Sequence, residues 1–263
     1  METVKTGSFS VDYLQFGRGN DSLVILPGAS VTSVMGAADA IEEAYAPLAE
    51  DFTLYLLDYR RDFPDAYSVH DMARDAYGAL RALELEHMCL FGASLGGMVA
   101  QVLAIEHPGL VRKLVLGSTA ARVSEDRRQL FQRWASLAEA GDARALCLSF
   151  GEAVYPPDVF DQLRGQLDEV AKAADTGDLA RFAAMMRAVE AFDVTGELGG
   201  IACPVLAIGS MDDRVLGAEG TLQIAGSLSG RPGFEMHLYD GYGHAAYDTA
   251  PDYRERMLRF LTA

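Results

Sequence analysis

A serine between glycines is the first feature of this sequence whose residue types and spacing could support chemistry. Residues 92–96 read Gly-Ala-Ser-Leu-Gly, after a short apolar run at 88–91 and before a helix-forming stretch. In a G-x-S-x-G pattern of this kind, a sharp strand–turn–helix connection holds the serine in strained dihedrals, and a Cβ at either glycine would clash with neighbouring backbone. The pattern therefore predicts that the hydroxyl of Ser94 is exposed at the end of a strand, where it could act as a nucleophile.

A serine hydroxyl is a weak nucleophile at neutral pH, and it needs a base that is itself oriented by an acid. Two loops after apolar runs supply such groups: Asp212 and Asp213 follow the run that ends at residue 208, and His244 follows the run that ends at residue 239. Asp240 is a further acid in the second loop. The order serine, aspartate, histidine along the chain is one of the known orders of a nucleophile–acid–base set.

The elements that must bring these loops together are visible as alternating strand and helix patterns. An alternating polar–apolar segment at 9–16 predicts a half-exposed strand, and helical periods separate the apolar runs that follow. These runs predict strands at residues 23–26, 52–57, 88–91, 114–116, 204–209 and 234–239. Strands that alternate with helices at this spacing predict an α/β fold with a mostly parallel, doubly wound sheet, whose carboxyl ends meet at one edge.

The alternation is interrupted by residues 122–197, which have helical periods and no convincing strand. We expect one domain, built from core segments 1–121 and 198–263, with residues 122–197 inserted as a helical lid. Trp134, Met185 and Met186 lie on the expected helices of this insertion. These three side chains are candidates for substrate contact, and packing between the helices is the alternative, because their helical spacing alone explains them.

Composition narrows the partners and the compartment. With 22 basic and 38 acidic residues among 263, the net charge of −16 argues against nucleic acid and anionic membranes as partners. No apolar run approaches the ~18 residues that suggest a membrane span, and no signal peptide is visible, so we expect a cytoplasmic protein. We expect Cys89, Cys147 and Cys203 to be small hydrophobic side chains in a reducing compartment, with no metal site.

Several separate segments together make the chain resemble the α/β-hydrolase fold superfamily over nearly its whole length. The segments that carry the resemblance are Leu26-Pro27-Gly28, residues 92–97, His107-Pro108 with residues 111–116, Gly209-x-x-Asp212-x-x-Val215 and Gly241-x-Gly243-His244. The resemblance implies a Ser-His-Asp triad and an acyl-enzyme mechanism with no metal and no organic cofactor. The family pattern places the acid three residues after the glycine, which favours Asp212 over Asp213 and Asp240.

The roles of the remaining candidates follow from this mechanism. Ser94 attacks a carbonyl carbon, His244 takes and later returns the proton, and Asp212 orients the imidazole. The oxyanion that forms needs two donors, for which we expect the backbone N–H groups of Leu95 and Ala29. Gly28 lets the backbone approach the substrate, so it is a candidate for substrate binding.

The predicted function is that of a serine hydrolase acting on a small, largely apolar carboxylic ester or related acyl substrate. Lactones, thioesters and carbon–carbon bonds are alternative substrates for the same triad. A ligand-sensing or protein-binding module with little turnover is the alternative from another functional class. Residues 60–64 stand where the family has a Gly-x-Gly-x-Ser loop, so the shape of this rim is left open, as is the oligomeric state.

Overall fold

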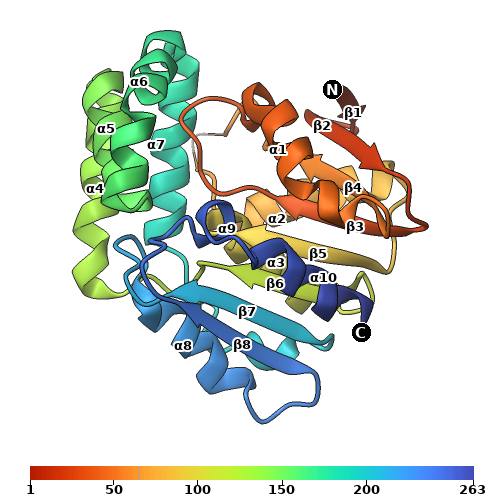
Figure 1. The fold of residues 1–263 in the computed structure, drawn as a ribbon. Coiled ribbons are helices and arrows are strands. Elements are labelled where there is room, and N and C mark those ends of the chain that lie inside the picture. Colours follow the sequence, from red (N-terminus) through yellow and green to blue (C-terminus); the bar gives the residue numbers. More distant parts are fainter. Residues whose placement is uncertain (65) are drawn as a thin grey trace.

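The computed structural model describes residues 1–64 and 66–263, and a twisted eight-stranded sheet forms the centre of this described part (Figure 1). The strand order is β1-β2-β4-β3-β5-β6-β7-β8, with antiparallel pairing of β1 with β2 and of β2 with β4, and parallel pairing in the rest. The strands are β1 (Glu2–Lys5), β2 (Ser10–Gly17), β3 (Asp21–Leu26), β4 (Phe52–Leu57), β5 (Met88–Ala93), β6 (Val111–Gly117), β7 (Val205–Ser210) and β8 (Phe234–Tyr239). The expected mostly parallel α/β sheet is confirmed, and the short edge strand β1 is an addition to it.

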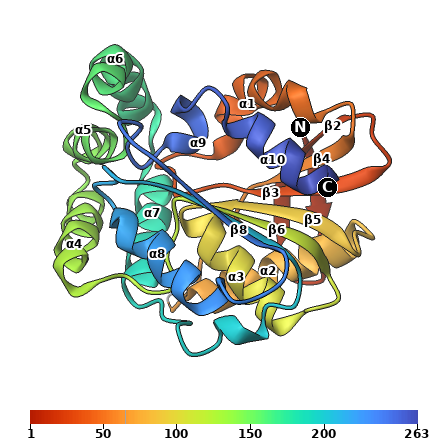
Figure 2. The same ribbon diagram turned by 60° about the horizontal axis from the view of Figure 1, so that its bottom comes forward.

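Helices cover both faces of the sheet, because neighbouring residues of each strand point to opposite sides. Val24 belongs to the hydrophobic core under α2 (Val69–Ala82), α3 (Leu95–Glu106) and α8 (Gly217–Leu228), whereas Leu23 belongs to the core on the other face. Figure 2 shows these two helical layers with the sheet between them. The second layer consists of α1 (Ala38–Tyr45), α9 (Ala246–Thr249) and α10 (Tyr253–Thr262); short 3-10 turns lie at Val34–Ala37, Ala46–Leu48 and Leu198–Gly200.

Four helices lie together between β6 and β7 in the chain, at one end of the sheet (Figure 1). They are α4 (Glu125–Glu139), α5 (Ala143–Val154), α6 (Pro157–Ala173) and α7 (Thr176–Glu190), all within the predicted insertion. A single bridge between Arg122 and Asp193 joins the two ends of the segment. Among the described helices none is both long and apolar enough to cross a bilayer.

Candidate active site

Ser94 lies at the sharp turn between β5 and α3, with φ +52° and ψ −116°. The flanking glycines are required by the close packing of this turn. A Cβ on Gly92 would lie 2.3 Å from the carbonyl oxygen of Gly96, and a Cβ on Gly96 would lie 2.1 Å from that of Leu26. The strained serine backbone is held by its own N–H, which donates to the Gly117 carbonyl at 2.8 Å.

His244 bridges Ser94 and an aspartate. Its Nε2 lies 2.9 Å from Ser94 Oγ, and its Nδ1 lies 2.8 Å from Asp213 Oδ2. Because an ionised carboxylate can only accept, Nδ1 carries the hydrogen and Nε2 is left to accept from the serine hydroxyl. The side chains of His244 and Asp213 are 3% and 2% exposed, so the bond between them is shielded from water.

Asp213 is held in the ionised form by its surroundings. Burial opposes ionisation, but the adjacent His244 ring and the backbone N–H groups of Leu216 and Val215 together keep the pKa of the carboxyl below its usual range. Asp213 Oδ1 accepts from these two N–H groups at 3.0 and 2.7 Å, while Oδ2 faces the imidazole. The carboxylate is therefore fixed in position as well as in charge.

The prediction that Asp212 contacts the histidine is wrong, because the structure places Asp213 there instead. Asp212 Oδ1 accepts from the Ser210 hydroxyl at 2.6 Å and from Gly241 N–H at 3.0 Å, and its Oδ2 accepts from Gly243 N–H at 3.1 Å. Strand β7 extends to Ser210, so the chain turns back toward the interior only at Asp213. Through its bonds to Gly241 and Gly243, Asp212 thus fixes the loop that carries His244.

The conformation of the loop that carries His244 depends on the bonds to Asp212 and on the loop's own glycines. Gly241 and Gly243 have φ +85° and +63°, in the left-handed region that side chains disfavour. Asp240, the other alternative acid, is exposed to solvent. The positive-φ turns and the bonds to Asp212 together deliver His244 to the serine.

The predicted oxyanion donors flank Ser94. Leu95 is the first residue of α3, so its N–H has no carbonyl partner within the helix. A Cβ built on Gly28 would lie 3.4 Å from Ser94 Cβ, which shows that the backbone before Ala29 runs against the serine. The Tyr59 hydroxyl donates to the Pro27 carbonyl at 2.8 Å and holds this segment from behind.

Comparison with known proteins agrees with the fold. A family model described as the alpha/beta hydrolase fold matches residues 40–251. The chain belongs to the alpha/beta hydrolase fold family. The expected family, fold class and hydrolase activity are thereby confirmed, at this level of detail.

Individual relatives of this hydrolase have low sequence identity to it. A protein of Rhizobium rhizogenes named "Putative carbamate hydrolase RutD" is 26% identical over 225 residues, which cover 82% of this chain and 85% of the relative. The enol-lactonase from Burkholderia xenovorans LB400 superposes with a TM-score of 0.85 over all of both chains at 20% identity. MGS-M2, an alpha/beta hydrolase from a Medee basin deep-sea metagenome library, gives a TM-score of 0.89 at 19% identity, over 100% of this chain and 98% of MGS-M2. At such identities the two structures show the shared fold alone.

Of the four residues predicted to contact substrate, the three in the helical segment are buried within it. Trp134 is fully buried between the rings of Phe131 and Phe150, and its Nε1 donates to Ser149 Oγ at 3.2 Å. Met185 and Met186 on α7 are 0% and 1% exposed. The structure therefore favours the packing alternative for these residues, because large apolar side chains at helical spacing fill the space between helices.

Tyr247, which no sequence pattern singled out, lies beside Gly28 and His244. Its hydroxyl is 3.7 Å from the position of a Cβ on Gly28, and its ring centre lies 6.3 Å from that of His244. The signal that points to it is an aromatic residue three positions after the histidine, on the short helix α9. Tyr247 therefore contributes to the wall around the serine.

The helical segment contacts the loops of Asp213 and His244 directly where α5 ends. Ala245 N–H, next to the histidine, donates to the Val154 carbonyl at 3.0 Å. Arg214, next to Asp213, donates to the Tyr155 carbonyl at 2.6 Å. A Cβ on Gly243 would lie 3.0 Å from the same Val154 oxygen, so this glycine also allows the close approach.

A second charged cluster lies at the end of β4. Ser33 Oγ donates to Asp58 Oδ2 at 2.5 Å, Tyr59 N–H donates to Asp58 Oδ1 at 2.7 Å, and Arg181 of α7 lies 3.6 Å from the same Oδ1. Arg181 and Asp58 have side chains that are each 4% exposed. This pairing joins the helical segment to the core two strands away from Ser94.

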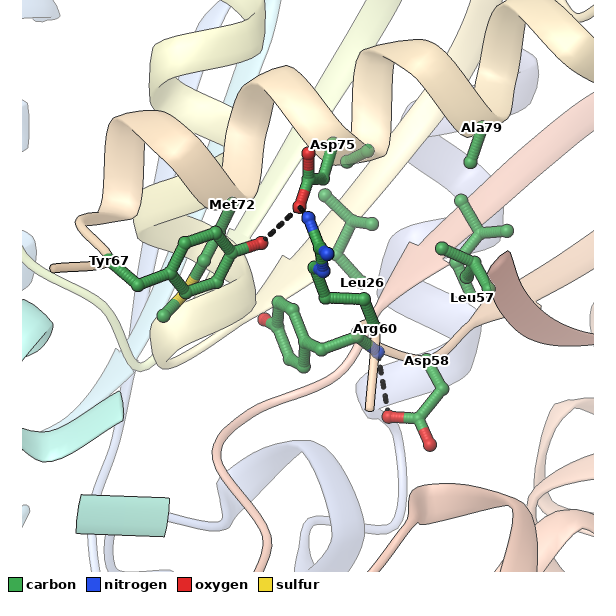
Figure 3. Close-up of a pocket in the computed structure, with 11 residues that line it drawn as sticks. Leu26, Leu57, Asp58, Arg60, Tyr67, Met72, Asp75 and Ala79 are labelled. Atoms are coloured by element: carbon green, nitrogen blue, oxygen red, sulfur yellow. Dashed lines mark hydrogen bonds and ion pairs between the residues drawn. The ribbon is translucent and has the colours of Figure 1, made fainter. Parts of the chain in front are cut away.

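The rim at residues 60–64, whose shape the sequence did not predict, is held by ion pairs. Arg60 lies 3.3 Å from Asp75, which also accepts from the Tyr67 hydroxyl at 2.6 Å, and Arg61 lies 2.8 Å from Asp12. Figure 3 shows Tyr67 and Arg60 converging on Asp75 in a small cavity behind the loop. Its volume of about 10 Å³ is enough for one water molecule at most, so it is not a substrate pocket.

The cysteines have no part in the site. All three are free thiols, buried at Cys89 and Cys147 and partly exposed at Cys203. Burial raises the pKa of Cys147 and of Cys203 to about 11, which keeps these thiols protonated and unreactive. No cluster of three or more metal-ligating side chains occurs among the residues that the structure describes.

Proposed function

We propose that this enzyme is a serine hydrolase that cleaves a small, largely apolar carboxylic ester or related acyl substrate through an acyl-enzyme intermediate. One observation carries the proposal: the unbroken chain of contacts from Ser94 Oγ to His244 Nε2 at 2.9 Å and from His244 Nδ1 to Asp213 Oδ2 at 2.8 Å. A hydroxyl, an imidazole and a buried carboxylate in this order can activate an otherwise weak nucleophile.

In the first half of the reaction, Ser94 attacks the carbonyl carbon while His244 Nε2 takes the hydroxyl proton. The imidazolium that forms is stabilised by Asp213, which remains ionised. Collapse of the tetrahedral intermediate breaks the bond to the leaving group, and His244 donates the proton to it. In the second half, a water molecule attacks the acyl-enzyme with His244 again as the base, which releases the acid and restores Ser94.

The oxyanion of each tetrahedral intermediate is bound by the N–H groups of Leu95 and Ala29 in this proposal. Leu95 is the first residue of helix α3, and the positive end of the helix dipole adds to the stabilisation of the oxyanion. Each donor of this kind contributes about 3–4 kcal/mol in the transition state. The Tyr59–Pro27 hydrogen bond keeps the Ala29 side of the hole in place.

The helices of residues 122–197 act as the lid of the substrate site in this proposal. Their contacts with the loops of His244 and Asp213, through Val154 and Tyr155, support such a role. We further propose that the enzyme acts in the cytoplasm, which the three free cysteines support, and on a small molecule.

A carbamate is a second candidate substrate, because relatives that align with 81–82% of this chain carry that activity in their name. Carbamates, lactones and esters all present an acyl carbon with a heteroatom leaving group, so the same triad would serve each of them. The discriminating measurement is a hydrolysis panel of esters of graded acyl length, lactones, thioesters and carbamates.

For the panel we expect turnover of at least one class by the wild type and no turnover by Ser94→Ala. Ligand-induced stabilisation without turnover of any class would favour the sensor function instead. Equal turnover by Ser94→Ala would show that Ser94 is not the nucleophile.

A further inference from the structure

Arg181 is a buried cation whose hydrogen bonds are not completed by the part of the chain that the structure describes. It lies on α7 and is 4% exposed, and its Nη2 has no hydrogen-bond partner among the described residues. Among the described residues, its ion-pair partner is Asp58, whose Oδ1 lies 3.6 Å from Nη1, which is too long for a hydrogen bond. The guanidinium thus has charge compensation and few acceptors.

Asp58 does not supply the missing acceptor, because each of its oxygens is anchored by another donor and Oδ1 lies 3.6 Å from Arg181. Oδ1 accepts from Tyr59 N–H at 2.7 Å and Oδ2 accepts from Ser33 Oγ at 2.5 Å. These bonds fix the carboxylate to the core. They leave it facing Arg181 without forming the two parallel bonds that a guanidinium makes with a free carboxylate.

A guanidinium has five N–H donors, and a buried donor without an acceptor costs about 1–3 kcal/mol, or more when it is charged. A position that served packing alone would be filled at lower cost by an apolar side chain. The arrangement is therefore suited to an acceptor that comes from outside the protein. A planar, doubly accepting anion matches the geometry of the guanidinium fork.

The position of Arg181 relates it to the reaction centre. Strand β3 lies between β4 and β5, and it pairs Leu56 with Ile25 and Ile25 with Phe91. Continued by two residues, this register places Asp58 level with Ala93, the residue before the nucleophile. Two strand spacings put Asp58 about 10 Å from that point, and Arg181 lies against Asp58.

We propose that Arg181 binds a carboxylate of the substrate, several bonds away from the carbonyl that Ser94 attacks. This inference rests on the proposed hydrolase function and makes it more specific: the substrate is an acyl compound with an otherwise apolar body and one carboxylate. Because Asp58 balances the charge of Arg181, the guanidinium would recognise such a substrate mainly through its N–H donors.

The test compares esters that differ in one group. Monomethyl succinate, glutarate and adipate are compared with the methyl esters of butyric, pentanoic and hexanoic acid, and O-acetyl hydroxy acids are compared with neutral acetates. We expect kcat/KM to be at least tenfold higher for the carboxylate-bearing member of the best-matched pair, mainly through a lower KM. The best chain length then reports the distance from Ser94 to Arg181, and the preferred series reports which half of the substrate carries the anion.

Variants assign the preference to one side chain. Arg181→Gln should bring the ratio of kcat/KM values within a pair to about one, whereas Arg187→Gln, an exposed position on the same helix, should leave that ratio at the wild-type value. Arg181→Lys retains the charge without the fork and should give an intermediate ratio. A wild-type enzyme that hydrolyses both members of every pair equally well would overturn the inference, whether or not the Arg181 variants fold.

A binding measurement separates this inference from the proposed function. Free glutarate and adipate should raise the Tm of the wild type and of Ser94→Ala, and should not raise that of Arg181→Gln. If no ester were hydrolysed while this Tm shift occurred, the hydrolase proposal would fail and the carboxylate site would stand. Absence of the shift in the wild type, together with equal hydrolysis within pairs, would exclude the carboxylate site.

Discussion

Two buried pairs of titratable side chains lie near the same edge of the sheet, and they differ in how completely the described residues satisfy their hydrogen bonds. In the pair of His244 and Asp213, the side chains are 3% and 2% exposed, and each facing atom of the ring and the carboxylate has a partner within 3 Å. In the pair of Arg181 and Asp58, the side chains are each 4% exposed, but the charged groups are 3.6 Å apart and a guanidinium nitrogen has no partner among the described residues.

The difference indicates two kinds of function. A network completed within the protein is preorganised to move a proton between its own members, and nothing needs to reorganise when the reaction begins. A buried cation with open donors is preorganised for a group that the protein lacks. We therefore interpret the first pair as the catalytic centre and the second as the site that recognises the substrate.

The largest expected effect comes from removing the base of the completed pair. His244→Ala should lower kcat by several orders of magnitude, because Ser94 loses the group that takes its proton. The circular dichroism spectrum should remain that of the wild type. A loss of less than tenfold in kcat would show that another group acts as the base.

The next effect separates two neighbouring aspartates. Asp213→Asn should lower kcat by about 10⁴-fold, because the amide no longer holds the imidazole in the required tautomer. Asp212→Asn should lower kcat far less, on the order of tenfold, because it weakens only the hydrogen bonds to Gly241 and Gly243. Steady-state kinetics of both variants with one ester tests this order, and the opposite order would restore Asp212 as the catalytic acid.

The pH dependence of stability gives a smaller effect on the same pair. The pKa of Asp213 is lower in the folded protein than the ordinary value of about 3.9, so its ionised form stabilises the fold. This contribution is fully present well above pH 4 and is lost as the pH falls through the folded pKa. Lowering the pH from 6 to 3 should therefore reduce the free energy of unfolding of the wild type more than that of Asp213→Asn. Chemical denaturation at each pH measures this free energy. Parallel curves for the two proteins would contradict the assignment.

The smallest expected effect concerns the segment between the two pairs. Tyr59→Phe removes the hydrogen bond to the Pro27 carbonyl, which is worth about 1 kcal/mol, and should lower kcat about fivefold with little change in KM. Tyr77→Phe, a partly exposed tyrosine stacked on His107, serves as the matched control and should leave both constants unchanged. An increase in KM with unchanged kcat would assign Tyr59 to substrate binding rather than to the oxyanion segment.

The sequence predicted those features that depend on local patterns. Alternating apolar runs and helical periods predicted the sheet and the inserted helices, and Gly92 and Gly96 predicted the turn at Ser94, because each signal lies within a few residues. The acid was assigned wrongly because the choice between Asp212 and Asp213 depends on how far β7 continues, which the spacing from Gly209 does not report.

Other features were outside the reach of any local pattern. The contact between Arg181 and Asp58 joins a helix of the insertion to the end of a core strand, and no signal near either residue predicts the other. Trp134 is a second example, because its helical spacing fits both packing and substrate contact. Its ring contacts with Phe131 and Phe150, which the spacing does not predict, favour packing.

The most direct test of the central claim is the rate at which a fluorophosphonate reacts with the protein, followed by intact mass and peptide mapping. We predict a single adduct on Ser94, formed at a rate that falls at least 100-fold in Asp213→Asn and by no more than about tenfold in Asp212→Asn. An adduct at another residue, or equal slowing by both substitutions, would contradict a catalytic centre built from Ser94, His244 and Asp213.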